Sequence, residues 1–198
     1  MVLMLSIDLD LQTREMLLEA ALGSIRHGIA HGEPPVGHAQ NTRNPRLLER
    51  AATFVTLKQY GHLRGCIGTL QVQRTLLDDV LYNAFAAAFR DPRFSAITSS
   101  DLENLEISIS LLGPQQEMTV RSESDLIKQL DVGIDGLVLE EGNGISATFL
   151  PSVWESLPKP EDFLINLKRK AGIHDRYWSD TLRFYRYRTC TFSNISPD

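Results

Sequence analysis

The stretch HLRGCIG, residues 62–68, contains a thiol whose neighbours could take part in chemistry. If residues 63–70 form a strand, Arg64, Cys66 and Gly68 share one face, because side chains alternate along a strand. The Arg64 guanidinium would then approach the sulfur and favour the thiolate, which is the nucleophilic form of cysteine. The pattern predicts a nucleophile or an anion-binding site, with Cys66 and Arg64 as catalytic residues and Arg64 as the anion anchor.

Two glycines, Gly65 and Gly68, remove side-chain bulk on either side of this thiol. Glycine weakens a strand, so it usually marks a bulge or a close approach by backbone or ligand. We therefore expect both glycines to line a binding cleft for a small ligand of unknown identity. A structural alternative stays open, because free cysteine is among the most buried residue types and Cys66 could serve as a small apolar side chain.

A nucleophilic cysteine normally needs a base within hydrogen-bonding reach, and histidine is the usual one. His62 is the nearest histidine to Cys66 and falls on the same strand face as Arg64, although a solvated turn histidine is the simpler interpretation. His27 and His31 have the spacing of a metal pair on a helix, but no third ligand is in view, so we expect no metal and no other cofactor.

Four further polar residues are candidates for binding. In RDPRF, Asp91 and Arg93 are expected to form an ion pair that fixes the turn, or to contribute to the site. Asn83 stands inside a predicted helix, where asparagine is mildly unfavourable, so we expect it to bond a specific partner, for which the hexapeptide strand is a candidate. Lys170 either complements the dipole at a helix C-terminus or places a cation in the cleft.

The elements that must position these residues follow from hydrophobic periodicity and from turn residues. Hairpins alternate with helices along the chain, which indicates an α+β fold with a largely antiparallel sheet flanked by helices. Helices are expected within residues 8–32, 75–94, 122–133 and 152–172, a helical turn at 45–50, two strands within 52–72 with a turn at Gly61 and His62, a strand within 102–114, a hairpin over 134–151 with its turn at EGNG, a last strand over 182–192 and a loop over 32–45.

The composition limits the classes of protein to which the chain can belong. The chain has 198 residues, 42% of them hydrophobic and 23% charged, which is typical of a single globular domain. A net charge of −5 gives no basic surface for nucleic acid, and no stretch reaches the ~18 apolar residues that a membrane span needs. Two cysteines without a signal-peptide pattern favour reduced thiols and a cytoplasmic location.

Several motifs together resemble one known family. HLRGCIGTL, NAFAAAFRDPRF, DGLVL, LPSVW and LKRKAG look like the AMME-syndrome candidate-region family, known in prokaryotes as protein A of the AmmeMemoRadiSam system. The resemblance covers about residues 10–190, so we expect one domain of this type over residues 1–198. It implies an α+β fold with a larger and a smaller subdomain, a cleft between them near the hexapeptide, and Memo-like and radical-SAM proteins as partners.

Three hypotheses for the function stay open. In the first, Cys66 attacks an electrophile in an acyl or alkyl transfer. In the second, the chain is a non-catalytic adaptor that docks Memo-like and radical-SAM partners. In the third, it is a carrier that holds a small molecule for those partners. The chain contains no recognisable Ser–His–Asp, P-loop, CxxC or dinucleotide motif, which weakens the enzyme hypothesis.

Overall fold

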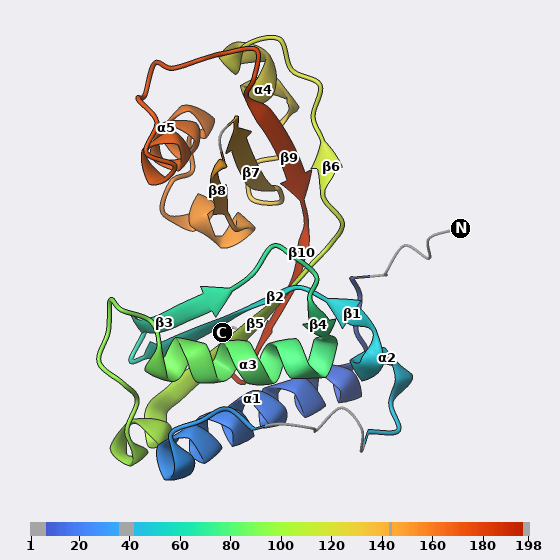
Figure 1. Cartoon of the computed structure of the whole chain (residues 1–198), viewed down its shortest axis with the longest axis vertical. Helices are drawn as coiled ribbons and strands as arrows, with labels where there is room; N and C mark the ends of the chain where they lie inside the picture. Colours follow the sequence, from blue (N-terminus) through green and yellow to red (C-terminus); the bar gives the residue numbers. More distant parts are fainter. Residues whose placement is uncertain (1–6, 36–41, 143, 196–198) are drawn as a thin grey trace. The chain divides into compact units, whose positions relative to one another are not determined.

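The computed structural model of the chain describes residues 7–35, 42–142 and 144–195 (Figure 1). These residues form two compact α+β units, each with an antiparallel sheet and helices, so the predicted fold class is confirmed. We call Gly113–Thr189 the inserted unit, because the chain enters it from a second unit and then returns to that unit. The second unit, called the host unit, comprises the described residues up to Leu112 and those from Cys190 onward. The cleft predicted between subdomains stays a prediction.

The host unit is built on a four-stranded sheet with the strand order β10-β5-β2-β3, and a two-stranded β1-β4 pair lies beside it. Strand β2 pairs antiparallel with both β3 and β5. The elements of this unit are α1 (Leu11–His31), α2 (Pro45–Leu48), β1 (Arg50–Ala51), β2 (Thr53–Gln59), β3 (His62–Gly68), β4 (Arg74–Thr75), α3 (Leu76–Phe89), a 3-10 turn (Ser99–Asn104), β5 (Leu105–Leu112) and β10 (Thr189–Ser193).

The two long helices begin at residues whose side chains cap them. The Asp10 carboxylate accepts a hydrogen bond from the backbone N–H of Thr13 at 2.7 Å, which starts α1. The Thr75 hydroxyl accepts one from the backbone N–H of Asp78 at 3.2 Å, which starts α3. Helix α1 ends at Gly32, whose φ of 76° is a left-handed conformation that glycine adopts readily. These local signals explain why both helices are predictable from the sequence.

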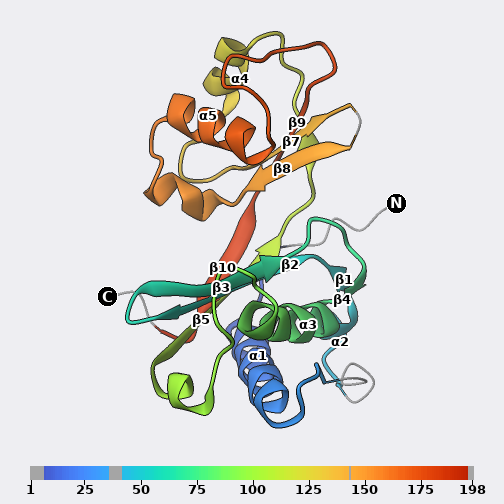
Figure 2. The same cartoon turned by 60° about the vertical axis from the view of Figure 1, so that its left-hand side comes forward.

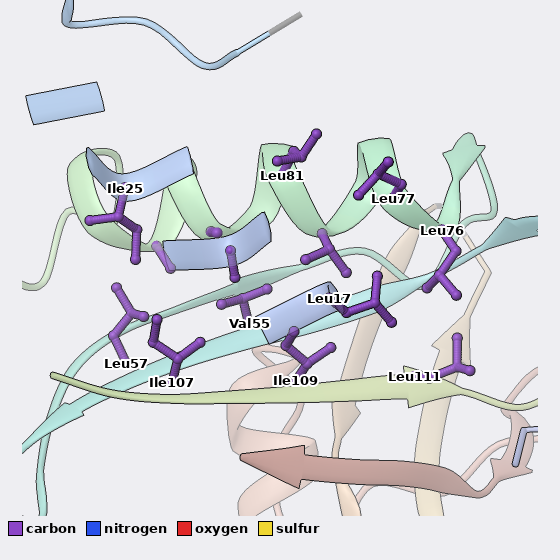
Figure 3. Packing of buried hydrophobic residues seen from close by; sticks show 14 of the residues in the cluster. Leu17, Ile25, Val55, Leu57, Leu76, Leu77, Leu81, Ile107, Ile109 and Leu111 are labelled. Atoms are coloured by element: carbon purple, nitrogen blue, oxygen red, sulfur yellow. The ribbon is translucent and has the colours of Figure 1, made fainter. Parts of the chain in front are cut away.

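One face of the host sheet carries the core. Helices α1 and α3 lie on the same side of the sheet in both views (Figures 1 and 2). In β5 the side chains alternate, so that Ile107 and Ile109 are buried while Ser108 and Ser110 are half-buried. Figure 3 shows the apolar side chains between sheet and helices. The opposite face of the sheet is therefore polar, as expected for a strand that alternates apolar and polar residues.

The inserted unit has its own sheet, with the strand order β6-β9-β7-β8, and its own core. Trp154 and Phe163 stack in that core with their ring centroids 3.8 Å apart. The buried Lys168 ammonium donates hydrogen bonds to Glu123 Oε2 at 2.6 Å and to the Asp175 carbonyl at 3.0 Å. The elements of this unit are β6 (Gln116–Glu117), α4 (Glu123–Gln129), β7 (Gly136–Glu141), β8 (Ile145–Phe149), a 3-10 turn (Pro151–Glu155), α5 (Pro160–Lys170) and β9 (Arg183–Tyr187).

The prediction of a single last strand over residues 182–192 is wrong. This stretch forms two strands in different sheets, β9 in the inserted unit and β10 in the host unit, with only Arg188 between them. The Arg188 carbonyl accepts a hydrogen bond from the Gly113 N–H at 2.8 Å, at the point where the chain first enters the inserted unit. Residue 143 of the predicted EGNG turn and residues 36–41 of the predicted loop lie outside the described residues.

Candidate functional site

The strand that carries Cys66 contains a bulge. Leu57 of β2 pairs with Gly65, but the next residue, Lys58, pairs with Leu63, so Arg64 has no partner opposite it in β2. A bulge of this kind breaks the alternation of side chains along the strand. Leu63 is accordingly 38% exposed. Cys66 lies beyond the bulge, in register with Thr56.

Arg64 is directed to a different partner from the one predicted. Its Nη2 lies 4.0 Å from Oδ2 of Asp101, in the 3-10 turn that precedes β5. Asp101 also accepts hydrogen bonds from the N–H and the hydroxyl of Thr98, and these bonds, more than Arg64, hold the pKa of Asp101 below its usual value. Among the described residues, Arg64 forms no hydrogen bond with the Cys66 sulfur, whose hydrogen bond comes from Thr56.

The Cys66 side chain belongs to the polar face of the host sheet. Its sulfur accepts a hydrogen bond from the Thr56 hydroxyl, with an Oγ1–Sγ distance of 3.3 Å. Ser108 lies opposite Thr56 on the next strand, β5, so the polar row continues across the sheet. Cys66 is half-buried, and both cysteines of the chain are free thiols. The thiol is therefore held by a hydroxyl and is not enclosed in the apolar core.

One ion pair holds the backbone of Cys66. Asp91 Oδ2 accepts the Cys66 N–H at 2.9 Å, and Arg93 Nη2 donates to the Cys66 carbonyl at 3.4 Å. The two side chains also pair with each other, at 2.9 Å from Arg93 Nε to Asp91 Oδ1 and at 2.7 Å from Nη2 to Oδ2. Strand β3 is at the edge of the sheet, so this pair binds groups that a further strand would otherwise bind. The predicted Asp91–Arg93 ion pair is confirmed.

The Asp91 carboxylate is buried, with 2% of its side chain exposed. The hydrogen bonds from the Arg93 side chain hold the pKa of Asp91 well below its usual range, and the Cys66 and Arg93 backbone N–H groups act in the same direction. The same pairing raises the pKa of Arg93, and the negative charge of a Cys66 thiolate adds a smaller contribution. Asp91 is thus a charged acceptor that cannot easily be protonated while the fold is intact.

The space beside both glycines is occupied by the protein itself. A Cβ atom added at Gly65 would overlap the backbone carbonyl oxygen of Ala87 in α3. A Cβ atom added at Gly68 would overlap the Phe54 ring and the Thr53 carbonyl oxygen. Gly65 therefore allows β3 to lie close to α3, and Gly68 leaves room for the residues of the paired strand β2. A role in ligand binding stays a prediction for each of them.

Asn83 bonds β2 rather than the strand that carries Cys66. Its Nδ2 donates to Oγ1 and to the carbonyl of Thr53, each at 3.1 Å, and to Asp79 Oδ2 at 2.9 Å. The same Asp79 oxygen accepts the N–H and the hydroxyl of Thr53, at 2.8 and 2.7 Å. All three side chains are buried, and burial raises the pKa of Asp79. This network fixes the start of β2 on α3.

The described histidines can be placed relative to Cys66 and to possible metal ligands, and a role of His62 as a base stays a prediction. His62 is exposed at the start of β3, and four residues of extended strand place its Cα about 13 Å from that of Cys66. His27 and His31 stack with their ring centroids 4.2 Å apart on α1. In residues 7–35, 42–142 and 144–195, no three His, Cys, Asp or Glu side chains form a group that could hold a metal ion.

Lys170, the last predicted binding residue, belongs to the inserted unit. Its ammonium donates to the Thr148 carbonyl at 2.9 Å and lies 5.2 Å from the centroid of the Phe149 ring. It thus joins the C-terminal end of α5 to strand β8 within that unit. The sequence reasoning missed Thr56, which comes opposite Cys66 only through the bulge and so has no local signal, and Asp101, whose signal was the Thr98–Asp101 helix-cap spacing.

Comparison with known proteins places these residues in a family. The AMMECR1 family model matches residues 18–192. A protein of Methanothermobacter thermautotrophicus is 32% identical over 169 residues, which cover 78% of this chain and 85% of the relative. Protein SSO0193 of Saccharolobus solfataricus is 34% identical over 161 residues, which cover 78% of this chain and 71% of the relative.

A solved structure has the same fold. The crystal structure of the uncharacterized protein PH0010 from Pyrococcus horikoshii superposes with a TM-score of 0.80 at 28% identity, and 90% of each chain is covered. The names of these three proteins state no activity. In addition, none of the described helices is both long and apolar enough to cross a membrane.

Proposed function

Because the chain belongs to the AMMECR1 family, we propose that it is a thiol-dependent protein in which Cys66 takes up an alkyl or acyl group from a small electrophilic molecule. The observation that carries this proposal is the way Cys66 is held. Asp91 and Arg93 bind its backbone N–H and carbonyl, and the Thr56 hydroxyl donates to its sulfur. A half-buried thiol with a fixed backbone and a donor at the sulfur suits a nucleophile better than a packing residue.

In the proposed alkyl transfer, the Cys66 sulfur attacks an electrophilic carbon. The C–S bond forms as the bond to the leaving group breaks, the leaving group departs with the electron pair, and the thiol proton goes to solvent. In the acyl form the same attack gives a thioester. The Thr56 hydroxyl donor stabilises negative charge on sulfur before the attack. The described residues offer no histidine beside the sulfur, so this proposal does not use His62 as a base.

Cys66 reactivity toward iodoacetamide in the native protein, followed by mass spectrometry of the modified peptide, tests the proposal. We expect Cys66 to react at least as fast as free glutathione, and Thr56→Val to slow it about two- to fivefold. Cys190, a half-buried thiol packed against the apolar core of the host unit, is the internal control and should react more slowly. Cys66→Ser should abolish the fast phase.

A Cys66 that stays unmodified until the protein is unfolded in urea would contradict the proposal. The adaptor hypothesis would then replace it, with the Memo-like and radical-SAM proteins implied by the family resemblance as the partners to test by co-purification. A thiol that must stay reduced also fits the proposed cytoplasmic location, where thiols are kept reduced.

A further inference from the structure

One edge of the Arg93 guanidinium forms hydrogen bonds within the protein, and much of the Arg93 side chain is exposed. The bonded edge comprises Nε and Nη2, which donate hydrogen bonds to the Asp91 carboxylate, and Nη2 also donates to the Cys66 carbonyl. No hydrogen bond of Nη1 is formed with the described part of the chain, and 56% of the Arg93 side chain is exposed. The guanidinium centre lies 5.2 Å from the centroid of the Phe94 ring, which supports it from one side.

The Asp91 carboxylate is much less accessible to an incoming molecule than the Arg93 guanidinium. The Asp91 side chain is 2% exposed, and its two oxygens accept hydrogen bonds from Cys66 and Arg93. An anion that approaches Cys66 from solvent therefore meets the guanidinium before the carboxylate. Arg64, the anchor predicted from the sequence, has its guanidinium near Asp101 instead, with 20% of its side chain exposed.

We propose that Arg93 makes the Cys66 site selective for electrophiles that carry a negative charge, such as a carboxylate or phosphate group. This inference rests on the proposed function, since it concerns the molecule that reaches the same thiol. Arg93 would bind the anionic group through Nη1, while Cys66 attacks the electrophilic carbon one or two bonds away. Guanidinium groups suit carboxylate and phosphate oxygens because their planar donors match those acceptors.

Iodoacetate and iodoacetamide are matched probes for this inference, because they share a leaving group and nearly the same size but differ in charge. With iodoacetate, the S–CH₂ bond forms, the C–I bond breaks, and iodide leaves with the electron pair. The quantity to measure is the ratio of the two rate constants at Cys66, iodoacetate over iodoacetamide, at low ionic strength. We expect Arg93→Gln to lower this ratio about three- to tenfold, and Arg93→Lys to retain most of it.

Two controls separate charge from structure. Arg64→Gln should leave the ratio within about twofold of the wild type, because its guanidinium is directed to Asp101. The double variant Asp91→Asn/Arg93→Gln removes both charges, so a ratio still below the wild type assigns the effect to the lost guanidinium rather than to an unpaired carboxylate. In the wild type, raising the ionic strength to 0.3 M should lower the ratio, which tests the inference without any substitution.

The outcomes distinguish the two proposals. If Cys66 reacts with neither probe in the folded protein, the proposed function fails. If it reacts with both, but the ratio is unchanged in the double variant and insensitive to salt, only the role of Arg93 is overturned. A ratio that falls in Arg64→Gln instead would transfer the anion-binding role to Arg64 and would also overturn this inference.

Discussion

Asp91 Oδ2 accepts the backbone N–H of Cys66 at 2.9 Å, and this bond joins the turn after α3 to the edge strand of the host sheet. The two residues are 25 positions apart in the sequence. The carboxylate that makes the bond is itself held by Arg93, so the position of the thiol depends on an ion pair that does not touch the sulfur. Asp91 therefore contributes both to the packing of the edge strand and to the position of Cys66.

The first prediction concerns Asp91→Asn and its dependence on pH. At pH 7 we expect the substitution to lower the free energy of unfolding by about 2 kcal/mol, because it removes charge-assisted hydrogen bonds from a buried group. The pKa of Asp91 is below its unfolded value of 3.8 in the folded protein, so below about pH 5 the unfolded chain binds more protons at this position. The contribution of the lowered Asp91 pKa to the free energy of unfolding is thus fully present above about pH 5 and is lost as the pH falls further.

Urea denaturation of the wild type and Asp91→Asn between pH 7 and pH 2 measures this effect. The difference between their free energies of unfolding should shrink as the pH falls below 4. Asp175→Asn is the matched control, because Asp175 also pairs with an arginine through both oxygens, but on the surface and without a strand N–H. Asp175→Asn should lower the free energy of unfolding less than Asp91→Asn does at every pH. If the free energies of unfolding of the wild type and Asp91→Asn differ by the same amount at every pH, the lowered pKa of Asp91 is contradicted.

The second prediction compares two glycine substitutions. Gly65→Ala should lower the free energy of unfolding by about 2 kcal/mol or more, because the new Cβ would overlap the Ala87 carbonyl and push β3 away from α3. Gly23→Ala should raise it by about 0.5–1 kcal/mol, because Gly23 lies within α1 and a Cβ there meets nothing within 4 Å. Thermal unfolding followed by circular dichroism measures both. Equal effects at the two positions would show that Gly65 does not pack as described.

The third prediction concerns the network of Asp79, Thr53 and Asn83. Asp79→Ala should lower the free energy of unfolding by about 3 kcal/mol, because it leaves the buried Thr53 N–H without its acceptor and removes one of the acceptors of the Asn83 amide. Asp79→Asn keeps an acceptor oxygen and should cost less. Chemical denaturation of the two variants at pH 7 gives the comparison, and similar losses would show that the hydrogen bonds to Asp79 contribute little.

Asp79 should also have the opposite pH dependence to Asp91. Burial raises the pKa of Asp79 above its unfolded value of 3.8, so the folded protein binds more protons here at mildly acidic pH. The part of the stability that comes from this tighter proton binding is present below pH 3.8 and is lost as the pH rises through the folded pKa of Asp79. The stability of Asp79→Asn relative to the wild type should therefore increase from pH 4 to pH 7, and a decrease would contradict the direction of this shift.

The sequence predicts the elements of this fold better than their connections. The caps at Asp10 and Thr75 and the alternation in Leu105–Leu112 are local signals, so the corresponding helices and strand are correctly predicted. The division of residues 182–192 between two sheets has no local signal, because β9 and β10 are both rich in aromatic or β-branched residues. Only the pairing partners distinguish them.

The candidate site shows the same limit. The Asp91–Arg93 pair is predictable because both residues lie in one turn. The bulge at Arg64 depends on the register of β3 against β2, and that register redirects the guanidinium from the Cys66 sulfur to Asp101. A simple alternation of side chains cannot contain this information. The same register brings Thr56 to the sulfur.

The return of the chain through β10 has a consequence for the order in which the protein is synthesised. The ribosome must make all of Gly113–Thr189 before it releases the last strand of the host sheet. That strand is at the sheet's edge, so β5, β2 and β3 can pair and pack on α1 and α3 while the inserted unit is still being translated. Completion of the host sheet then needs only the addition of one strand at its edge.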